Sequence, residues 1–167
     1  MAEPPNPGRW KPRVTVAAVV ERDGRYLMVE EHTREGLRLN NPAGHLDPAE
    51  SLVEAVKREV LEETSCRFEP DALVGIYLSR FRRSDGEDVT YLRFAFCGRV
   101  GEPQAGFVLD EGIVRTLWMT PAELRASAAR HRSPLVLQCL DDHLAGRRFP
   151  LQALTAHPSL YDPWTPG

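Results

Sequence analysis

Residues 44–66 have the sequence GHLDPAESLVEAVKREVLEETSC and carry the strongest structural signal in the chain. Residues 50–64 predict a helix, because apolar side chains recur there at helical spacing. Asp47 is the expected N-cap and Pro48 the expected first helical residue, since a short polar side chain accepts free N–H groups at a helix start and proline lacks one. We therefore expect a loop that begins at a glycine and leads into an acidic helix.

Three glutamates of this helix, Glu59, Glu62 and Glu63, are predicted to share one face. At 100° per residue they fall within an arc of about 100°, and the valines of the helix fall directly beside that arc. This acidic arc should then lie at the rim of the hydrophobic core, at the edge of solvent. The alternative is an ordinary solvated acidic face, as charged residues usually provide.

An acidic arc of this kind suits a divalent cation, because clustered carboxylates raise one another's pKa and repel phosphate unless a cation lies among them. Mg²⁺ prefers oxygen ligands, keeps several waters and bridges to phosphate groups. Such a cation would neutralise a polyphosphate and lower the pKa of a bound water. The residues alone therefore predict metal-assisted hydrolysis of a phosphate compound.

The spacing within this stretch resembles the motif of a known family. Gly44, five residues, Glu50, seven residues, Arg58-Glu59-Val60, one residue, Glu62-Glu63 and, after two more, Cys66 are similar to the Nudix box, G-x5-E-x7-R-E-U-x-E-E-x-G-U, where U is bulky and apolar. The second glycine is Ser65 here, so the turn after the helix lacks the residue that most easily adopts a left-handed conformation. The resemblance implies a Nudix hydrolase of the α/β class, an α/β/α sandwich around a mixed sheet.

The resemblance also implies which box residues form the site. Mg²⁺, or Mn²⁺ in its place, would be bound by Gly44 through its carbonyl oxygen and by Glu59, Glu62 and Glu63 through their carboxylates. Arg58 would join the three glutamates as a catalytic residue that orients the site by pairing with Glu50 between helix and loop.

The general base and the substrate contacts lie outside the helix. In this family the base is a box glutamate or an acid from a later loop; of the loop acids Asp110 and Glu111 we select Glu111, with a solvated loop acid as the alternative. Arg93 and His45 are the candidate substrate-binding residues. The alternatives are that Arg93 is an ordinary surface arginine and that His45 forms hydrogen bonds only with the backbone. A base is able to stack on Tyr26, Tyr77 or Tyr91, although the strand spacing of these tyrosines favours core packing.

The resemblance extends from Lys11 to Leu151 and is greatest to bacterial phosphatases of the NudJ type. It implies a Mg²⁺-dependent hydrolase of nucleoside tri- and diphosphates and related small diphosphates, hydroxymethylpyrimidine diphosphate among them, that releases orthophosphate. Residues 81–84 lack the proline and tyrosine that mark ADP-ribose and dinucleoside polyphosphate hydrolases. Two alternatives remain: a Nudix pyrophosphatase of another nucleoside-diphosphate-linked substrate, and a non-catalytic Nudix-like module that senses a nucleotide.

Alternating strands and helices elsewhere fit this fold. Asp23-Gly24 and Ser84-Asp85-Gly86 predict the turns of two hairpins, and Thr120 to Glu123 has the spacing of a capping box. The predicted strands are 14–20, 25–30, 73–81 and 89–100, with another short strand that ends at Trp118-Met119. One further helix is predicted to begin at 120 and another to span 135–145. We expect a flexible segment at 1–12, a Nudix domain at 13–154 and a proline-rich tail at 155–167.

The composition predicts one soluble globular domain of 167 residues with a net charge of -3. That net charge is too near neutral for a protein that binds a long nucleic acid. No apolar run approaches the roughly 20 residues of a membrane span and no signal peptide is evident, so we expect no membrane association and a cytoplasmic location. The three cysteines predict reduced core thiols. The expected partner is a small phosphate substrate, and the chain is expected to be a monomer or a homodimer.

Overall fold

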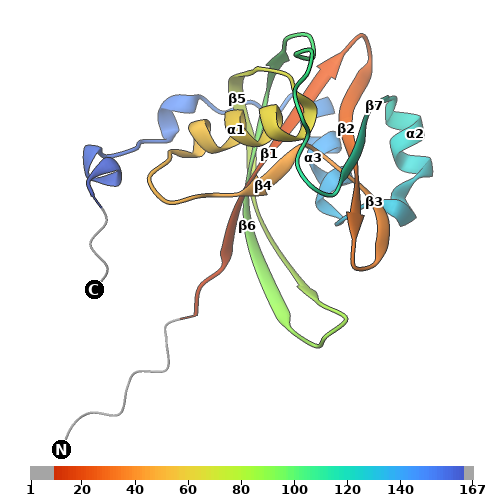
Figure 1. The fold of residues 1–167 in the computed structure, drawn as a ribbon, viewed down its shortest axis with the longest axis horizontal. Helices are drawn as coiled ribbons and strands as arrows, with labels where there is room; N and C mark the ends of the chain where they lie inside the picture. Colours follow the sequence, from red (N-terminus) through yellow and green to blue (C-terminus); the bar gives the residue numbers. More distant parts are fainter. Residues whose placement is uncertain (1–9, 164–167) are drawn as a thin grey trace, which may run out of the picture.

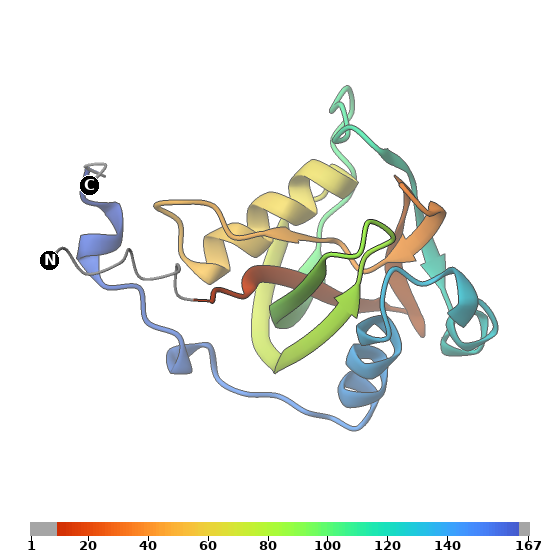
Figure 2. The ribbon, with the colours of Figure 1, turned by 90° about the horizontal axis from the view of Figure 1, so that it is seen from below.

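A computed structural model describes residues 10–163 of the chain and has the expected α/β architecture. A mixed sheet separates helix α1 on one face from helix α3 on the other (Figure 1, Figure 2). In chain order the elements are β1 (Arg13–Arg22), β2 (Arg25–Thr33), β3 (Gly36–Asn40), β4 (Ala43–His45), α1 (Leu52–Thr64), β5 (Phe68–Arg82), β6 (Asp88–Val100), β7 (Ile113–Met119), α2 (Pro121–Ala126), η1 (Ala128–Arg130), α3 (Leu135–Leu144), η2 (Leu151–Ala153) and η3 (Pro158–Tyr161).

The sheet has the strand order β3-β2-β1-β6-β5, and β1 and β6 are its parallel pair. The two predicted hairpins, β1–β2 and β5–β6, are both antiparallel. Asp23 and Gly24 have φ angles of 51° and 75°, which is the left-handed geometry that a two-residue turn between twisted strands requires. Strands β3 and β4 are not among the elements that the sequence predicts.

The sheet divides next to the first hairpin. β1 and β2 pair only beside their turn, at Glu21 with Tyr26 and Arg22 with Arg25. Further along, β1 pairs with β4 on one side, while β2 pairs with β3 and β7. Because β1 and β2 diverge, side chains from both faces of the sheet reach the space between them.

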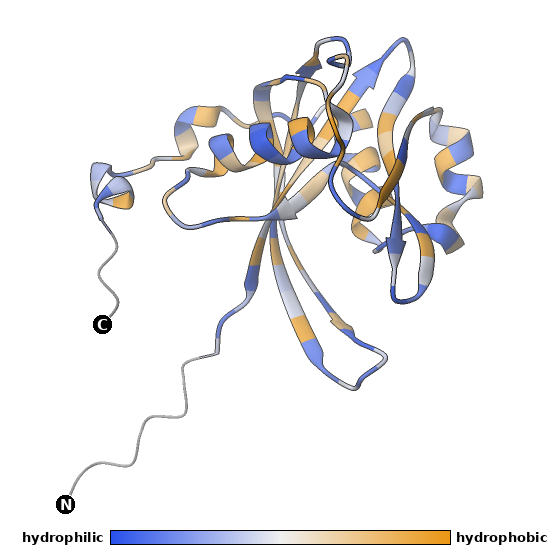
Figure 3. Ribbon diagram, viewed as in Figure 1, coloured by the Kyte–Doolittle hydropathy of each residue, from blue (hydrophilic) through white to orange (hydrophobic). Residues whose placement is uncertain are grey.

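The core consists of two layers, one on each face of the sheet. Alternate residues of β1 enter different layers, because successive strand side chains point to opposite faces. Val16 and Ala18 pack with α1, whereas Val19 packs with α3. Hydrophilic and hydrophobic residues lie side by side along α1 (Figure 3). The apolar side of this helix packs against the sheet, and its acidic residues lie near the place where β1 and β2 diverge.

Helix α1 begins later than the sequence predicts, and Asp47 is not its N-cap. Ser51 is the N-cap: its hydroxyl accepts from the Glu54 N–H, and the Glu54 carboxylate accepts from the Ser51 N–H. This reciprocal capping box satisfies two backbone donors, which explains why the helix starts here and not at Pro48. The loop before it is closed by a bond from the Asp47 N–H to the Glu50 carboxylate, 2.7 Å long.

Ser65 takes the role of the missing box glycine. Its φ angle is 58°, and its N–H donates to the Leu61 carbonyl at the end of α1. A left-handed conformation costs a residue with a Cβ atom about 1 kcal/mol, so the serine preserves the turn at a modest loss of stability.

The ends of the chain differ in how much of them is described. Most of the predicted flexible segment 1–12 lies outside the described residues. In the proline-rich tail, residues 158–161 form η3, and the Tyr161 hydroxyl donates to the Glu54 carboxylate at 2.7 Å. This contact places the tail against the start of α1.

Two further expectations concern the cysteines and the membrane. Cys66, Cys97 and Cys139 are buried free thiols, as expected. Within residues 10–163, no helix has both the length and the apolar character that crossing a bilayer requires.

Candidate active site

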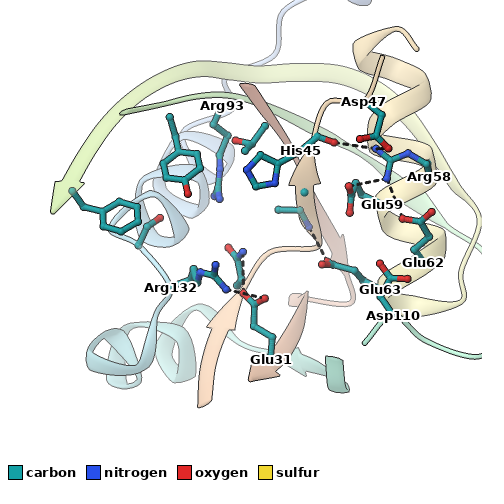
Figure 4. Close-up of a pocket in the computed structure, with 17 residues that line it drawn as sticks. Glu31, His45, Asp47, Arg58, Glu59, Glu62, Glu63, Arg93, Asp110 and Arg132 are labelled. Atoms are coloured by element: carbon teal, nitrogen blue, oxygen red, sulfur yellow. Dashed lines mark hydrogen bonds and ion pairs between the residues drawn. The ribbon is translucent and has the colours of Figure 1, made fainter. Parts of the chain in front are cut away.

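The acidic arc of α1 borders a cavity of about 350 Å³ at the division of the sheet (Figure 4). Glu59 and Glu63 are buried, with 8% and 7% of their surface exposed, while Glu62 is only partly covered. The expectation that the whole arc borders solvent is therefore wrong for two of its members. They are buried because β4 packs against them, and the Ala43 N–H donates to the Glu63 carboxylate at 2.9 Å.

Gly44 provides the space that the Glu59 carboxylate occupies. A Cβ atom placed on Gly44 would lie 2.0 Å from Cδ of Glu59, far inside van der Waals contact. Gly44 is held there by antiparallel pairing with Val16 of β1. The box glycine is thus required for close approach of strand and helix, and not for an unusual backbone angle.

Arg58 connects the loop, the strand and the helix. Its Nε and Nη2 donate to the two carboxylate oxygens of Glu50, at 2.9 and 2.7 Å, which is the pairing expected from the box. Its Nη1 also donates to Glu59 at 2.8 Å and to Glu62 at 3.0 Å. These bonds raise the pKa of Arg58, so it stays charged and holds two of the acidic side chains in place.

The acidic side chains have unusual proton affinities. Burial, with smaller contributions from Glu59, Glu31 and Asp110, raises the pKa of Glu63 to about 9. Burial also raises the pKa of Glu59, although the Arg58 guanidinium acts in the opposite direction. Without a cation, Glu63 is therefore protonated at neutral pH, and a positive ion at this place would favour its ionised form.

The donor set fits a hard cation that keeps part of its water shell. Among residues 10–163, no three His, Cys, Asp or Glu side chains already converge as a complete cation site. In this arrangement the Arg58 guanidinium donates to both Glu59 and Glu62. Mg²⁺ needs only one or two protein carboxylates and retains several waters, so Glu59, Glu62, Glu63 and the Gly44 carbonyl are sufficient candidates.

The loop before β7 contributes an acid to the cavity, but not the expected one. Asp110 lines the cavity, and its N–H donates to the Glu62 carbonyl at 3.0 Å. Glu111 is exposed and does not belong to the lining residues. The geometry therefore favours Asp110, which the sequence analysis placed second, because the bond to α1 directs Asp110 toward the carboxylates.

Both candidate substrate-binding residues line the opposite wall of the cavity. Arg93 is 7% exposed, so it is not an ordinary surface arginine, and its Nε and Nη1 have no hydrogen-bond partner among the described residues. His45 stands next to Gly44, and burial lowers the pKa of its ring. Leaving buried guanidinium nitrogens without a partner is costly, so Arg93 is able to donate hydrogen bonds to a ligand in this cavity.

Several cavity residues are not among the predicted substrate contacts, and these include Thr15, Asn40 and Tyr91. Tyr91 precedes Arg93 by two residues and so shares its face of β6, a signal that was available in the sequence. Asn40 ends β3, a strand that the sequence does not predict, and nothing local marks it. Thr15 is placed by its register with Arg93 across two parallel strands.

The sequence of this chain is similar to those of known proteins. The NUDIX domain family matches residues 11–139. Phosphatase NudJ of Escherichia coli strain K12 is 35% identical over 146 residues, covering 87% of this chain and 92% of that protein.

Solved structures agree with the sequence relatives. A NUDIX hydrolase from Nitrosomonas europaea superimposes with a TM-score of 0.82 at 50% identity, covering 88% of this chain and 98% of that one. A MutT NUDIX hydrolase from Burkholderia pseudomallei has a TM-score of 0.63 at 23% identity, covering 80% and 98%, and shares the fold.

Proposed function

The chain belongs to the Nudix family of hydrolases, and from this premise we propose that it is a Mg²⁺-dependent phosphatase of small phosphate anhydrides. Its substrates are nucleoside tri- and diphosphates and related diphosphates such as hydroxymethylpyrimidine diphosphate, and its product is orthophosphate. This proposal is carried by one observation: a single cavity joins a buried acidic cluster to Arg93, whose guanidinium nitrogens Nε and Nη1 have no hydrogen-bond partner within residues 10–163. A cavity of about 350 Å³ accommodates a small ligand and not a polymer.

The cation site of this proposal consists of Glu59, Glu62, Glu63 and the Gly44 carbonyl, with Mn²⁺ able to replace Mg²⁺. When bound, the cation would neutralise phosphate oxygens and lower the pKa of a bound water. The protein supplies the positions of the ligands. The missing side chain of Gly44 admits Glu59, and the Ala43 N–H holds one oxygen of Glu63.

Arg58 is a positioning residue in this proposal. Its guanidinium contacts Glu59 and Glu62 from the helix side and Glu50 from the loop side, so it sets the distance between loop and helix. Asp110 replaces Glu111 as the proposed general base. The Asp110 carboxylate lines the cavity, so it can accept a proton directly from the attacking water.

The choice between the two loop acids is testable with a matched pair of variants. We expect Asp110→Asn to lower turnover about tenfold, less than a typical general base contributes, because water can partly replace an exposed carboxylate. Glu111→Gln, the adjacent control, should leave turnover within a factor of about two. A larger loss in Glu111→Gln than in Asp110→Asn, measured as initial rate at saturating substrate, would return the role to Glu111.

The product identifies the bond that is cleaved. Similarity to Phosphatase NudJ over most of both chains supports release of orthophosphate. Nucleoside triphosphates, nucleoside diphosphates and hydroxymethylpyrimidine diphosphate should be incubated with the protein, with and without Mg²⁺, and the products separated by anion-exchange chromatography. We expect diphosphate and orthophosphate as the first products of a triphosphate, and no turnover when EDTA removes the cation.

Two other results would each contradict one part of this proposal. Monophosphate and pyrophosphate in the first minutes would contradict the phosphatase assignment and favour a Nudix pyrophosphatase. Full activity in EDTA would contradict the proposed dependence on a divalent cation.

A further inference from the structure

Three polar side chains on the wall opposite α1 form a group that phosphate hydrolysis does not by itself require. We define the polar cradle as Thr15, Asn40 and Arg93, all buried and all lining the same cavity. Thr15 of β1 lies in register with Arg93 of β6 and with His45 of β4, so these three side chains share one face of the sheet. That face is directed toward α3, away from the face on which α1 packs.

The cradle contains buried atoms without partners. Thr15 Oγ1, Asn40 Oδ1 and two nitrogens of Arg93, Nε and Nη1, form no hydrogen bond within the described part of the chain. Buried polar atoms are nearly always paired, so a concentration of exceptions in one cavity indicates that a ligand supplies the partners. Figure 4 shows the Arg93 guanidinium extending into the space between β4 and α3.

The donor and acceptor character of Arg93 and of Asn40 is determined. Arg93 can only donate. Asn40 Nδ2 donates to Glu31 at 3.4 Å, and this bond orients the amide because an ionised carboxylate can only accept. Asn40 Oδ1 is therefore an acceptor. A ligand that satisfies the cradle must offer one donor to Asn40 and two acceptors to Arg93.

An aromatic wall adjoins the polar cradle. Tyr91 and Phe81 stack on each other with ring centres 5.5 Å apart and planes within 5°, and both line the cavity. Tyr91 shares the face of β6 that carries Arg93. Flat aromatic surfaces beside a hydrogen-bonding cluster suit a flat ring.

An anion fits this wall less well than a neutral ring. The Glu31 carboxylate contacts Asn40 and is itself paired with Arg132 at 3.1 Å, so the positive charge of Arg132 is already compensated. A phosphate next to Asn40 Oδ1 and Glu31 would meet two groups that repel it. In the proposed function the phosphates would instead lie at the acidic arc, on the other side of β4.

We propose that the polar cradle binds the ring of the substrate, a nitrogen heterocycle with an amino group next to ring acceptors, as on the hydrogen-bonding edge of cytosine. The amino group donates to Asn40, and two acceptors of the ring receive the N–H groups of Arg93. Thr15 supplies a hydroxyl that serves either role. This inference rests on the proposed function for the placement of the phosphates at the acidic arc, and it assigns the opposite wall to base specificity.

The test compares ring substrates with one that has no ring. We expect kcat/KM for CTP to exceed that for UTP at least about tenfold, because uracil offers a donor where cytosine offers an acceptor. Arg93→Met should lower kcat/KM for CTP about tenfold or more and lower it by a clearly smaller factor for inorganic tripolyphosphate, which has no ring. Arg99→Met, on the same strand but outside the cavity, is the control and should change neither.

A second variant distinguishes a loss of binding from a loss of folding. Thr15→Val keeps the shape of the side chain and removes an unpartnered buried hydroxyl, so its melting temperature should equal or exceed that of the wild type. Its affinity for a non-hydrolysable methylene analogue of CTP, measured by calorimetry, should nevertheless fall. Unchanged affinity in both Thr15→Val and Arg93→Met would overturn the inference.

The remaining outcomes separate the inference from the proposed function. Equal kcat/KM for CTP and UTP, or an equal loss for tripolyphosphate and CTP in Arg93→Met, would overturn the ring assignment and leave phosphate hydrolysis intact. In the latter case Arg93 binds a phosphate. If no substrate is hydrolysed but the CTP analogue still binds more tightly than its UTP counterpart, the proposed function fails and the ring assignment stands.

Discussion

Glu63→Gln should lower turnover at least about 100-fold, because stabilisation of developing phosphate charge by a cation amounts to several kcal/mol. The amide keeps the shape of the side chain and still accepts the Ala43 N–H, so the cavity should stay intact. Turnover at saturating substrate and Mg²⁺ measures the effect. Glu69→Gln, an exposed glutamate paired with Lys57, is the matched control and should remain near wild type.

The same variant should not unfold the protein, and this separates a catalytic role from a structural one. Burial raises the pKa of Glu63 from an ordinary value of 4.5 to about 9, so the folded protein binds a proton there that the unfolded chain releases. That stabilisation is complete below about pH 4.5 and is lost as the pH rises through about 9. The melting temperature of metal-free Glu63→Gln should therefore equal the wild type near pH 5 and exceed it increasingly toward pH 9. Turnover within a factor of about three of wild type would remove Glu63 from the site.

Gly44→Ala should have the second large effect, a loss of turnover of about 100-fold, through a purely steric cause. The added Cβ would lie 2.0 Å from Cδ of Glu59, so the carboxylate must leave its position and the bond from Arg58 must change with it. Displacing one cation ligand from its position should lower turnover roughly as much as removing the charge of that ligand. Turnover and Mg²⁺ affinity, measured together, should fall together.

Gly101→Ala is the control for this substitution. A Cβ atom on Gly101 would meet no described atom within 4 Å, so both turnover and melting temperature should remain close to those of the wild type. If Gly44→Ala retained wild-type turnover, the close approach of β4 to Glu59 would have no part in the reaction.

Features that depend on neighbours in sequence were predictable without the structure. The two hairpins, the capping box at Thr120 and the helical arc of Glu59, Glu62 and Glu63 follow from contacts between residues at most four apart. The pairing of Arg58 with Glu50 spans eight residues and was accessible through the box pattern. Even here, competition between local signals misled the prediction, because Ser51 with Glu54 caps the helix in place of Asp47.

The residue types of the acidic arc and its place on one helix face were predictable from local sequence, because helix geometry is set by local bonds. Three features depend on the packing of distant segments. Glu59 and Glu63 are buried, Asp110 and not Glu111 lines the cavity, and Thr15, Asn40 and Arg93 meet there. The physical reason is register: β1 aligns with β4 on one edge and with β6 on the other, so residues up to 78 positions apart share one face. A one-residue shift of β6 against β1 would move Arg93 to the opposite face, a one-residue shift of β4 against β1 would do the same to Gly44, and no local pattern specifies either alignment.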